Sequence, residues 1–506
     1  MSDKKSPRTN LQNLGLLSGI ILFLVFINFN LIPENISASK MAAVALLMAV
    51  LWMTEAVPLA VTALLPIILF PFLQIIDAKM VANQYFNSTI ILFLGGIIIA
   101  VAIESWGLHK RISLQIIKII GGGQKALIFG FMLASALVSM FINNTATAVM
   151  MFPIGYAIIL QLEEKYDKDL VKGFSIALML GIGYSCSIGG VGTLVGTAPN
   201  LIFQRIFQMN FPEGPQITFS NWLPIGLTIS MSMLAVSWFV LTKLFIKKGH
   251  NIQIDKNFVK DEYKKLGRAI FEEKVLLIIL LFTGFLWVFK QELNLGFVVI
   301  PGWSNFLGID KWVDDGTVVI FMVLLLFIIP SKTKPDRTIL DSKLFKKIPW
   351  DIVLLFGGGF ALAEGFQQTG LSKVVGEQLS VIGSIHPFIM IIIICSILTF
   401  LTELTSNTAT AQTLLPIIAA LSVSLEINPL LLMIPATISA SFAFMLPVAT
   451  PPNAIIFSSG KVTIKEMMKA GIFLNLIGII LVSFIMYFLG SKIFNFDPNI
   501  FPVWGK

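Results

Sequence analysis

Two stretches of the chain repeat one polar motif inside apolar surroundings. Residues Phe141–Gly155 read FINNTATAVMMFPIG, and residues Leu401–Ile418 read LTELTSNTATAQTLLPII. Asn144 and Asn407 are 263 residues apart, and each begins Asn-Thr-Ala-Thr with a Pro nine positions after the Asn. A shared spacing of this kind indicates an internal repeat, so the segments around the motif decide the fold.

The composition is typical of a membrane protein. Hydrophobic residues make up 56% of the 506 residues, charged residues make up 13%, and the mean hydropathy is +0.86. A soluble protein carries about 25% charged residues, and the apolar runs of about 18 residues or more that recur along this chain suit spanning helices. We expect an all-α polytopic membrane protein with eleven spanning helices, at residues 13–32, 40–57, 59–75, 88–107, 171–206, 222–246, 275–290, 316–330, 351–368, 430–458 and 469–491.

The distribution of charge predicts the orientation of the chain. With the N-terminus in the cytoplasm, 28 of the 36 Lys and Arg residues fall in cytoplasmic segments, which is the positive-inside pattern. This pattern accounts for the net charge of +8 without a nucleic-acid partner. An odd number of spans then places the C-terminus, Lys506, outside the cell membrane. For the basic segment 243–274 the sequence indicates no role beyond a surface connector.

Two apolar regions, residues 126–160 and 387–424, do not fit this alternation of sides. Each is too long for one spanning helix and too short for two with a loop. The charge bias holds downstream only if each region enters and leaves on the same side. We therefore expect two re-entrant helical hairpins with the Asn and Thr residues at their tips, because non-helical backbone at membrane depth must be buried in protein or line a wet cavity.

Two further apolar segments contain helix-breaking residues. Ile188–Phe203 reads IGGVGTLVGTAPNLIF, and Ser441–Phe457 reads SFAFMLPVATPPNAIIF, at a spacing of 253 residues. Since Thr followed by Pro is a favourable helix start, we expect Thr197 and Thr450 to begin second half-helices. Hairpins and broken helices in matching positions predict an inverted-topology repeat, with a transport site near the membrane midplane.

The residue types at these four places suit an anion together with a cation. Each tip and each break begins a helix, whose N-terminus offers unpaired N–H groups and about half a positive charge. Four such ends sum to about +2 at most, which suits a doubly charged anion. Carbonyls at the ends of the preceding half-helices, with hydroxyls and Asn carbonyls, suit Na⁺. Glu403 is the acidic residue near a tip, and its role, in function or in supporting the loop, stays open.

These motifs resemble those of the divalent anion:sodium symporter (DASS) family of di- and tricarboxylate transporters. The matching motifs are Ser-Asn-Thr at 406–408 with its altered form Asn-Asn-Thr at 143–145, Thr-Ala-Pro-Asn at 197–200, Thr-Pro-Pro-Asn at 450–453, and Trp-x-Thr-Glu-Ala at 52–56. The resemblance covers nearly the whole chain. It implies a homodimer in the lipid membrane, in which a scaffold domain holds the dimer and a transport domain carries the substrate by an elevator movement.

The resemblance also implies a division of the chain and a set of site residues. The division is a cytoplasmic tail (1–12), first scaffold helices (13–107), the first hairpin and broken helix of the transport domain (126–206), connecting and scaffold helices (222–368), and the second hairpin, broken helix and last helix of the transport domain (387–491).

The implied substrate ligands are Asn144, Thr145, Asn407, Thr408, Thr450 and Pro451. One Na⁺ is implied near Ser139, Asn143, Asn144 and Gly192, and a second near Thr402, Thr405, Asn407 and Ala449. The family has Ser where this chain has Asn143, whose side-chain carbonyl can still bind Na⁺.

The expected activity is secondary transport of C4-type dicarboxylates (succinate, malate or fumarate) coupled to Na⁺. A Na⁺-independent dicarboxylate or 2-oxoglutarate exchanger and a membrane channel remain as alternatives. The sequence does not choose among these substrates, citrate and sulfate, and it does not determine the number of Na⁺ ions. An enzyme is not expected, because no nucleophile–base constellation stands out.

Overall fold

The computed structural model describes residues 9–29, 32–246, 256–294, 299–379 and 385–505. Within them the regular secondary structure is helical apart from one pair of short strands, in which β1 (Leu293–Asn294) pairs with β2 (Val299–Ile300). Residues 1–8 of the expected cytoplasmic tail, residues 247–255 of the basic segment, and Lys506 lie outside the described residues.

The helices of the first half, in chain order, are α1 (Asn10–Asn28), α2 (Ile36–Thr54), α3 (Leu59–Thr62), α4 (Leu65–Phe72), α5 (Ala78–Tyr85), α6 (Ser88–Ser105), α7 (Leu108–Ile120), α8 (Gln124–Ser139), α9 (Asn144–Lys165), α10 (Lys168–Val191), α11 (Ala198–Asn210), α12 (Phe219–Phe245) and α13 (Lys256–Lys265). Those of the second half are α14 (Phe271–Val288), α15 (Trp303–Phe306), α16 (Asp315–Ile328), η1 (Ser342–Lys347), α17 (Trp350–Gln368), α18 (Leu371–Leu379), α19 (Pro387–Thr402), α20 (Asn407–Ser424), α21 (Pro429–Ser439), α22 (Pro451–Phe457), α23 (Ile464–Ile485), η3 (Met486–Gly490), α24 (Ser491–Ile493) and η4 (Val503–Gly505).

The predicted spans all coincide with helices, and their ends shift by a few residues. Segment 59–75 differs in detail, because it forms two short helices, α3 and α4, with Pro66 in the first turn of α4. Segments 171–206 and 430–458 are broken, as predicted, into α10 with α11 and α21 with α22. By length and apolarity alone, seven helical segments of the described chain are able to cross a membrane.

The internal repeat is confirmed in the order of the helices. Helices α7, α8 and α9 begin at residues 108, 124 and 144, and α18, α19 and α20 begin 263 residues later, at 371, 387 and 407. A glycine precedes α7 and α18, with φ of 75° at Gly107 and 72° at Gly370. Glycine adopts this left-handed backbone at no steric cost, so each repeat turns sharply at the same place. The sequence analysis had not predicted α7 and α18 as separate helices.

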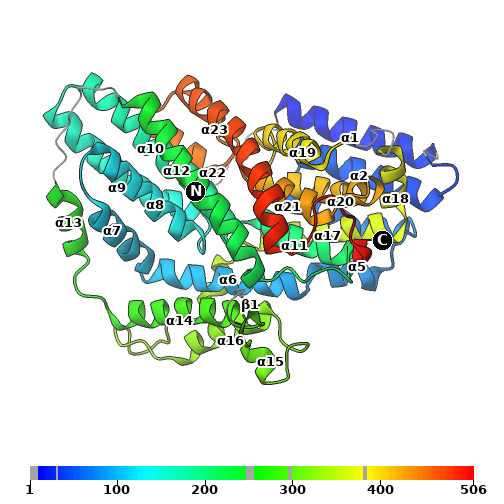
Figure 1. Ribbon diagram of the computed structural model, residues 1–506, viewed down its shortest axis with the longest axis horizontal. Coiled ribbons are helices and arrows are strands. Elements are labelled where there is room, and N and C mark those ends of the chain that lie inside the picture. The colour runs from blue at the N-terminus through cyan, green and yellow to red at the C-terminus, as the bar shows by residue number, and fades with distance from the viewer. Residues whose placement is uncertain (1–8, 30–31, 247–255, 295–298, 380–384, 506) are drawn as a thin grey trace.

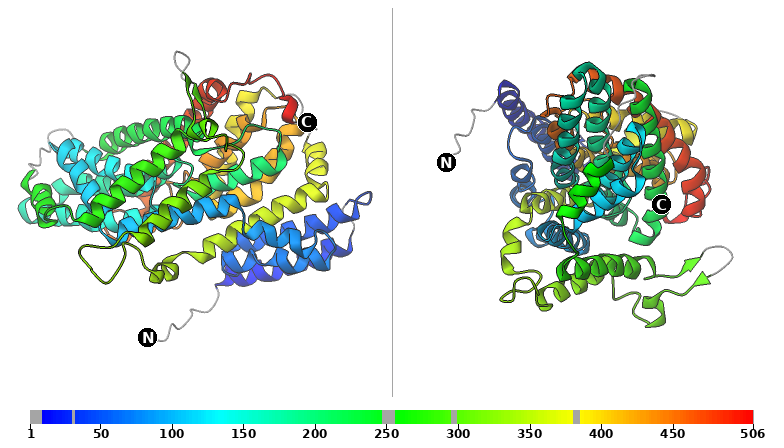
Figure 2. Two further views of the ribbon diagram at one scale, coloured as in Figure 1. Left: turned by 90° about the horizontal axis from the view of Figure 1, so that it is seen from below. Right: turned by 90° about the vertical axis from the view of Figure 1, so that its left-hand side faces the viewer.

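Each broken helix contacts both hairpins. Helix α10 packs on its own hairpin, α8 and α9, and α21 packs on α19 and α20. Beyond the breaks the partners change, because α11 packs on α20 of the second hairpin and α22 packs on α9 of the first. Figure 1 shows α11 near the middle of the molecule, with α7 to α9 at one end and α1, α2 and α18 at the other. In both views of Figure 2, α1 and α2 (blue) lie at the outer edge. The exchange of partners brings both tips and both breaks together.

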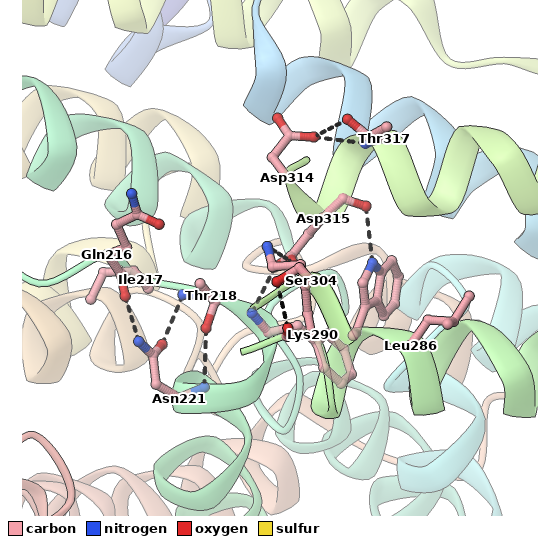
Figure 3. A network of polar contacts seen from close by, with 12 residues as sticks. Gln216, Ile217, Thr218, Asn221, Leu286, Lys290, Ser304, Asp314, Asp315 and Thr317 are labelled. Carbon is pink, nitrogen blue, oxygen red and sulfur yellow. Dashed lines mark hydrogen bonds and ion pairs between the residues drawn. The ribbon is translucent and has the colours of Figure 1, made fainter. Parts of the chain in front are cut away.

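Helices α14 and α16, at the lower edge of Figure 1, are joined to each other by a buried ion pair and to α12 by a hydrogen bond. Lys290 Nζ lies 2.5 Å from Asp315 Oδ1, and both side chains are buried. Asp315 Oδ2 accepts the N–H of Phe219, the first residue of α12, at 2.9 Å, and Figure 3 shows this network. The backbone carbonyl of Asp315 accepts the indole N–H of Trp287 at 2.9 Å. Because a buried charge is stable only when it is paired and hydrogen-bonded, this network holds the ends of α12, α14 and α16 together.

Candidate functional site

One cavity of about 1230 Å³ contains both hairpin tips and both helix breaks. Exposed residues far from the tips also line it, among them Thr9, Lys347 and Asp351, and we call this exposed end the mouth of the cavity. The predicted site residues that line it are Asn143, Asn144, Thr145, Thr405, Asn407, Thr408, Ala449, Thr450 and Pro451. The other predicted residues, Ser139, Gly192 and Thr402, are buried behind this lining.

At the first tip, three oxygen atoms from three segments meet. The hydroxyl of Ser139, at the end of α8, donates to Asn144 Oδ1 at 2.6 Å and lies 2.8 Å from the carbonyl oxygen of Cys186 on α10. Cys186 was not among the predicted residues, because nothing in the sequence distinguishes a carbonyl oxygen that lies beside the tip.

The second tip contains the same arrangement. The hydroxyl of Thr402, at the end of α19, lies 2.7 Å from Asn407 Oδ1 and 2.8 Å from the carbonyl oxygen of Ala440, just beyond α21. Ser139 and Thr402 are 263 residues apart, as are Asn144 and Asn407. We call these two groups the first oxygen cluster (Ser139, Asn144, Cys186) and the second oxygen cluster (Thr402, Asn407, Ala440).

Two oxygen clusters of this kind suit hard cations without acidic ligands. Hydroxyl, amide and free carbonyl oxygens at the ends of half-helices are the groups that coordinate Na⁺ in transporters with broken helices. Among the described residues, no group of three or more His, Cys, Asp or Glu side chains is arranged to hold a metal. Thr405, a predicted ligand, instead lies 2.9 Å from the Leu401 carbonyl and 2.6 Å from the Thr410 hydroxyl.

On the side away from its oxygen cluster, each hairpin tip is the start of a helix. Asn143 is the N-cap of α9, and its side-chain oxygen accepts the N–H of Thr145 at 2.8 Å. Ser406 is the N-cap of α20 but makes no side-chain hydrogen bond there. Helix N-termini attract anions through their free N–H groups and dipole. An anion in the cavity therefore meets the N-termini of α9 and α20 from the two repeats.

The two breaks also begin helices, and the Asn that ends each Thr-x-Pro-Asn motif stabilises the break. Asn200 Nδ2 donates to the carbonyls of Gly190 at 3.3 Å and Thr193 at 2.8 Å. Asn453 Nδ2 donates, 253 residues later, to the carbonyls of Ala443 at 3.0 Å and Leu446 at 3.1 Å. Both Asn side chains are buried. The motif thus supplies donors to carbonyls that the broken helix leaves free.

Thr197 and Thr450 are the N-caps of α11 and α22, as predicted. Only Thr450 caps through its side chain, since its hydroxyl accepts the N–H of Asn453 at 3.3 Å, while Thr197 makes no such bond. Because α22 has seven residues and α11 has thirteen, the dipole of α22 is the weaker of the two.

Glu403 supports the second break. Its carboxylate accepts the backbone N–H groups of Phe444 at 2.7 Å, Met445 at 2.9 Å and Leu446 at 3.1 Å. It also accepts Asn475 Nδ2 of α23 at 2.8 Å, and its side chain is buried. The carboxylate therefore faces the backbone rather than the cavity, in the supporting arrangement that the sequence had left open.

Residues 12–494 match the family described as "Sodium:sulfate symporter transmembrane region". The sodium-dependent dicarboxylate transporter SdcS of Staphylococcus saprophyticus is 40% identical to this chain, over 98% of this chain and 95% of the relative. SdcS of Staphylococcus aureus strain MRSA252 is 39% identical over the same shares of the two chains.

Two solved structures share the fold at low sequence identity. MtrF of Neisseria gonorrhoeae, described as an antimetabolite efflux pump, superposes with a TM-score of 0.54 at 14% identity, over 92% of this chain and 97% of MtrF. The YdaH transporter of Alcanivorax borkumensis gives a TM-score of 0.54 at 12% identity, over 94% of this chain and 96% of that one. At this identity the likeness concerns the fold alone.

Proposed function

This chain belongs to the sodium:sulfate symporter family, and on that premise we propose that it carries C4-type dicarboxylates across the cell membrane together with Na⁺. The 39–40% identity to sodium-dependent dicarboxylate transporters along nearly the whole chain supports this substrate class. Succinate, malate and fumarate all present the two carboxylates that two facing helix N-termini suit.

The observation that carries the proposal is the pair of equivalent oxygen clusters, each of which meets the lining of one cavity at an Asn beside a helix N-terminus. A dianion that leaves water needs compensating charge. Among the residues that line the cavity, the cationic side chain is Lys347, and its Nζ lies 3.3 Å from the hydroxyl of Ser105 at the mouth. The helix dipoles are partial charges and stay with the empty carrier, so mobile cations supply the remainder.

Each hairpin tip has an oxygen cluster on one side and a helix N-terminus on the other, and we assign the roles of the site residues from these two sides. Asn144 and Thr145 of the first repeat, and Asn407 and Thr408 of the second, would donate to the substrate carboxylates, with Thr450 and Pro451 bordering them. The first oxygen cluster, with Asn143 and Gly192, would hold one Na⁺. The second oxygen cluster, with Thr405 and Ala449, would hold another. Each Asn then contacts a cation with its carbonyl and the anion with its amide, which couples the two binding events.

We further propose a homodimer that works by an elevator movement, with the hairpins, the broken helices and α23 as the moving part. The exchange of packing partners supports this division, because α11 and α22 join the two repeats into one unit. Thr9 and Lys347, at the cavity mouth, belong to segments that the charge pattern assigns to the cytoplasm. On that assignment the structure is an inward-facing state.

Uptake of labelled succinate into proteoliposomes, with and without an inward Na⁺ gradient, tests the function. We expect uptake to rise steeply with external Na⁺ and to fall when choline replaces it. Equal rates of succinate counterflow in Na⁺-free buffer would overturn the symport proposal in favour of dicarboxylate exchange. Flux that does not saturate with succinate would favour a channel.

A reporter fused after Lys506 tests the orientation separately. We expect a reporter that is active only in the cytoplasm to be silent, because the predicted number of spans is odd. A fully active reporter would show that one hairpin crosses the membrane.

A further inference from the structure

Helix α23 carries an exposed apolar face along its length. The exposed fractions on this face are 49% for Ile464, 42% for Met468, 48% for Leu476, 61% for Ile480 and 55% for Phe484. The helix opens the apolar segment Ile464–Ile493, which is long enough to cross a membrane, and its N-terminal part lies at the upper edge of Figure 1. Such a face on a spanning helix contacts lipid chains.

Two lysines interrupt this apolar face near its start. Lys465 and Lys469 are both exposed, and residues four apart on a helix lie on the same face. The nearby acidic residue, Glu466, is otherwise engaged, since it accepts hydrogen bonds from Thr463 and pairs with Lys172 at 3.6 Å. Within the described part of the chain, neither lysine ammonium group forms an ion pair or a hydrogen bond.

The two lysines line a single groove of about 630 Å³. The other residues that line it are apolar: Met445, Ile464, Met468 and Ile472. Lysines within the first turns of a spanning helix extend their ammonium groups toward the membrane surface. The charge pattern assigns this end of α23 to the cytoplasmic side, where anionic lipids give the surface a negative potential. The groove thus combines two lysines with four apolar side chains at the end of α23 that this pattern places near the membrane surface.

We propose that this groove binds an anionic phospholipid. The lipid phosphate lies between the ammonium groups of Lys465 and Lys469, and one acyl chain covers Met468, Ile472 and Met445. The inference requires that α23 be embedded in the membrane, and it does not depend on which substrate is transported.

The position of Met445 connects this lipid to the transport site. Met445 lies in the second break, and its N–H is one of the groups that the Glu403 carboxylate accepts, at 2.9 Å. The bound acyl chain therefore covers the outer side of the break whose inner side contributes Ala440 to the second oxygen cluster.

The test measures binding of phosphatidylglycerol to the purified full-length protein, by native mass spectrometry and by the thermal unfolding midpoint in detergent. We expect phosphatidylglycerol to bind and to raise the midpoint, while phosphatidylcholine and inorganic phosphate leave it unchanged. Each lysine near an anionic surface contributes about five-fold in affinity, so Lys465→Gln with Lys469→Gln should weaken binding by about 25-fold.

Two control variants make the test specific. Lys343→Gln with Lys346→Gln removes two exposed lysines of η1, which do not line the groove, and should leave binding unchanged. Lys465→Arg with Lys469→Arg keeps both positive charges and should retain phosphatidylglycerol binding. Equal phosphatidylglycerol binding by the Gln double variant, or an equal response to inorganic phosphate, would overturn the proposal. Because the readout is binding, a failure of succinate uptake would leave this result intact.

Discussion

The break between α10 and α11 spans six residues, 192–197, whereas the break between α21 and α22 spans eleven, 440–450. The two breaks occupy equivalent places in the repeat, yet α21 ends earlier than α10. The hairpins beside the two breaks also differ in a residue that contacts the break. The second hairpin has Glu403, and the position 263 residues earlier in the first hairpin is Met140.

Backbone N–H groups in a buried segment must find acceptors. In the second repeat Glu403 accepts the N–H groups of residues 444–446, so the chain leaves the helix early without leaving donors unpaired. In the first repeat Met140 offers no side-chain acceptor, and α10 continues as a helix to Val191. Thr193 then donates its hydroxyl to the backbone carbonyl of Met140. The side chain on the hairpin thus decides where the neighbouring helix stops.

The longer helix of the first repeat needs glycines where the tip approaches it. A Cβ at Gly190 would lie 2.8 Å from Asn144 Oδ1, and one at Gly189 would lie 2.2 Å from the carbonyl oxygen of Ala136. The positions 253 residues later are Phe442 and Ala443, because the second repeat has already left the helix there. The two repeats therefore form equivalent oxygen clusters with different backbone conformations.

The largest effect on transport should come from substituting the Asn of the hairpin tip, which both repeats share. We expect Asn144→Ala and Asn407→Ala each to lower succinate uptake at least ten-fold, because a hydrogen bond to a charged group contributes about 1.5–3 kcal/mol and each substitution also removes a proposed cation ligand. Uptake by proteoliposomes measures the effect, and size-exclusion chromatography checks the fold. If one variant transports normally, the two tips do not have equivalent roles.

The next largest effect should separate the repeats. Glu403→Ala leaves three backbone N–H groups and the Asn475 amide without an acceptor, so we expect a loss of about 3 kcal/mol or more of stability. The matched variant Met140→Leu in the first repeat conserves volume and should cost less than about 1.5 kcal/mol. Thermal unfolding in detergent measures both. A Glu403→Ala protein as stable as the parent would show that the carboxylate does not support the break.

A smaller effect is expected at the hydroxyls of the two clusters. Thr402→Val and Ser139→Ala each remove one oxygen while the shape is nearly kept. Each should raise the Na⁺ concentration for half-maximal uptake by about five- to ten-fold, as the loss of a hydrogen-bonding partner worth about 1–1.5 kcal/mol implies. Variants that change the succinate dependence but not the Na⁺ dependence would reassign these hydroxyls to the anion.

The smallest effect should come from exchanging the N-caps. Asn143→Ser makes the first tip match the second, and Ser406→Asn does the reverse. Because Ser and Asn are comparable N-caps, we expect Na⁺-dependent uptake within about two-fold of the parent in both variants. A Na⁺ requirement that appears only in Asn143→Ser would show that the Asn amide replaces the first cation in the parent.

Much of the site was predictable because its signals are local in sequence. The two Asn-Thr-Ala-Thr stretches and the two Thr-x-Pro-Asn motifs mark helix starts, and helix starts depend on the residues within one turn. The sequence did not predict that Cys186 and Ala440 contribute, because every residue has a backbone carbonyl and no residue type marks the one that will lie beside a tip. It also did not predict the hydrogen bonds of Glu403, because a carboxylate does not indicate which distant N–H groups it will accept.

The sequence by itself determined the helical class, the repeat spacing and the places where helices begin, because apolarity, proline and capping residues act within a few positions of the chain. Only the tertiary structure decided that α11 packs on α20 and α22 on α9, which assembles one cavity from four separate segments. The tertiary structure also decided that the second break is the longer one, through the contact of Glu403 with residues 444–446. Such contacts join residues about 40 positions apart or more, and they form only when the whole chain buries its apolar surface and must still satisfy every backbone donor.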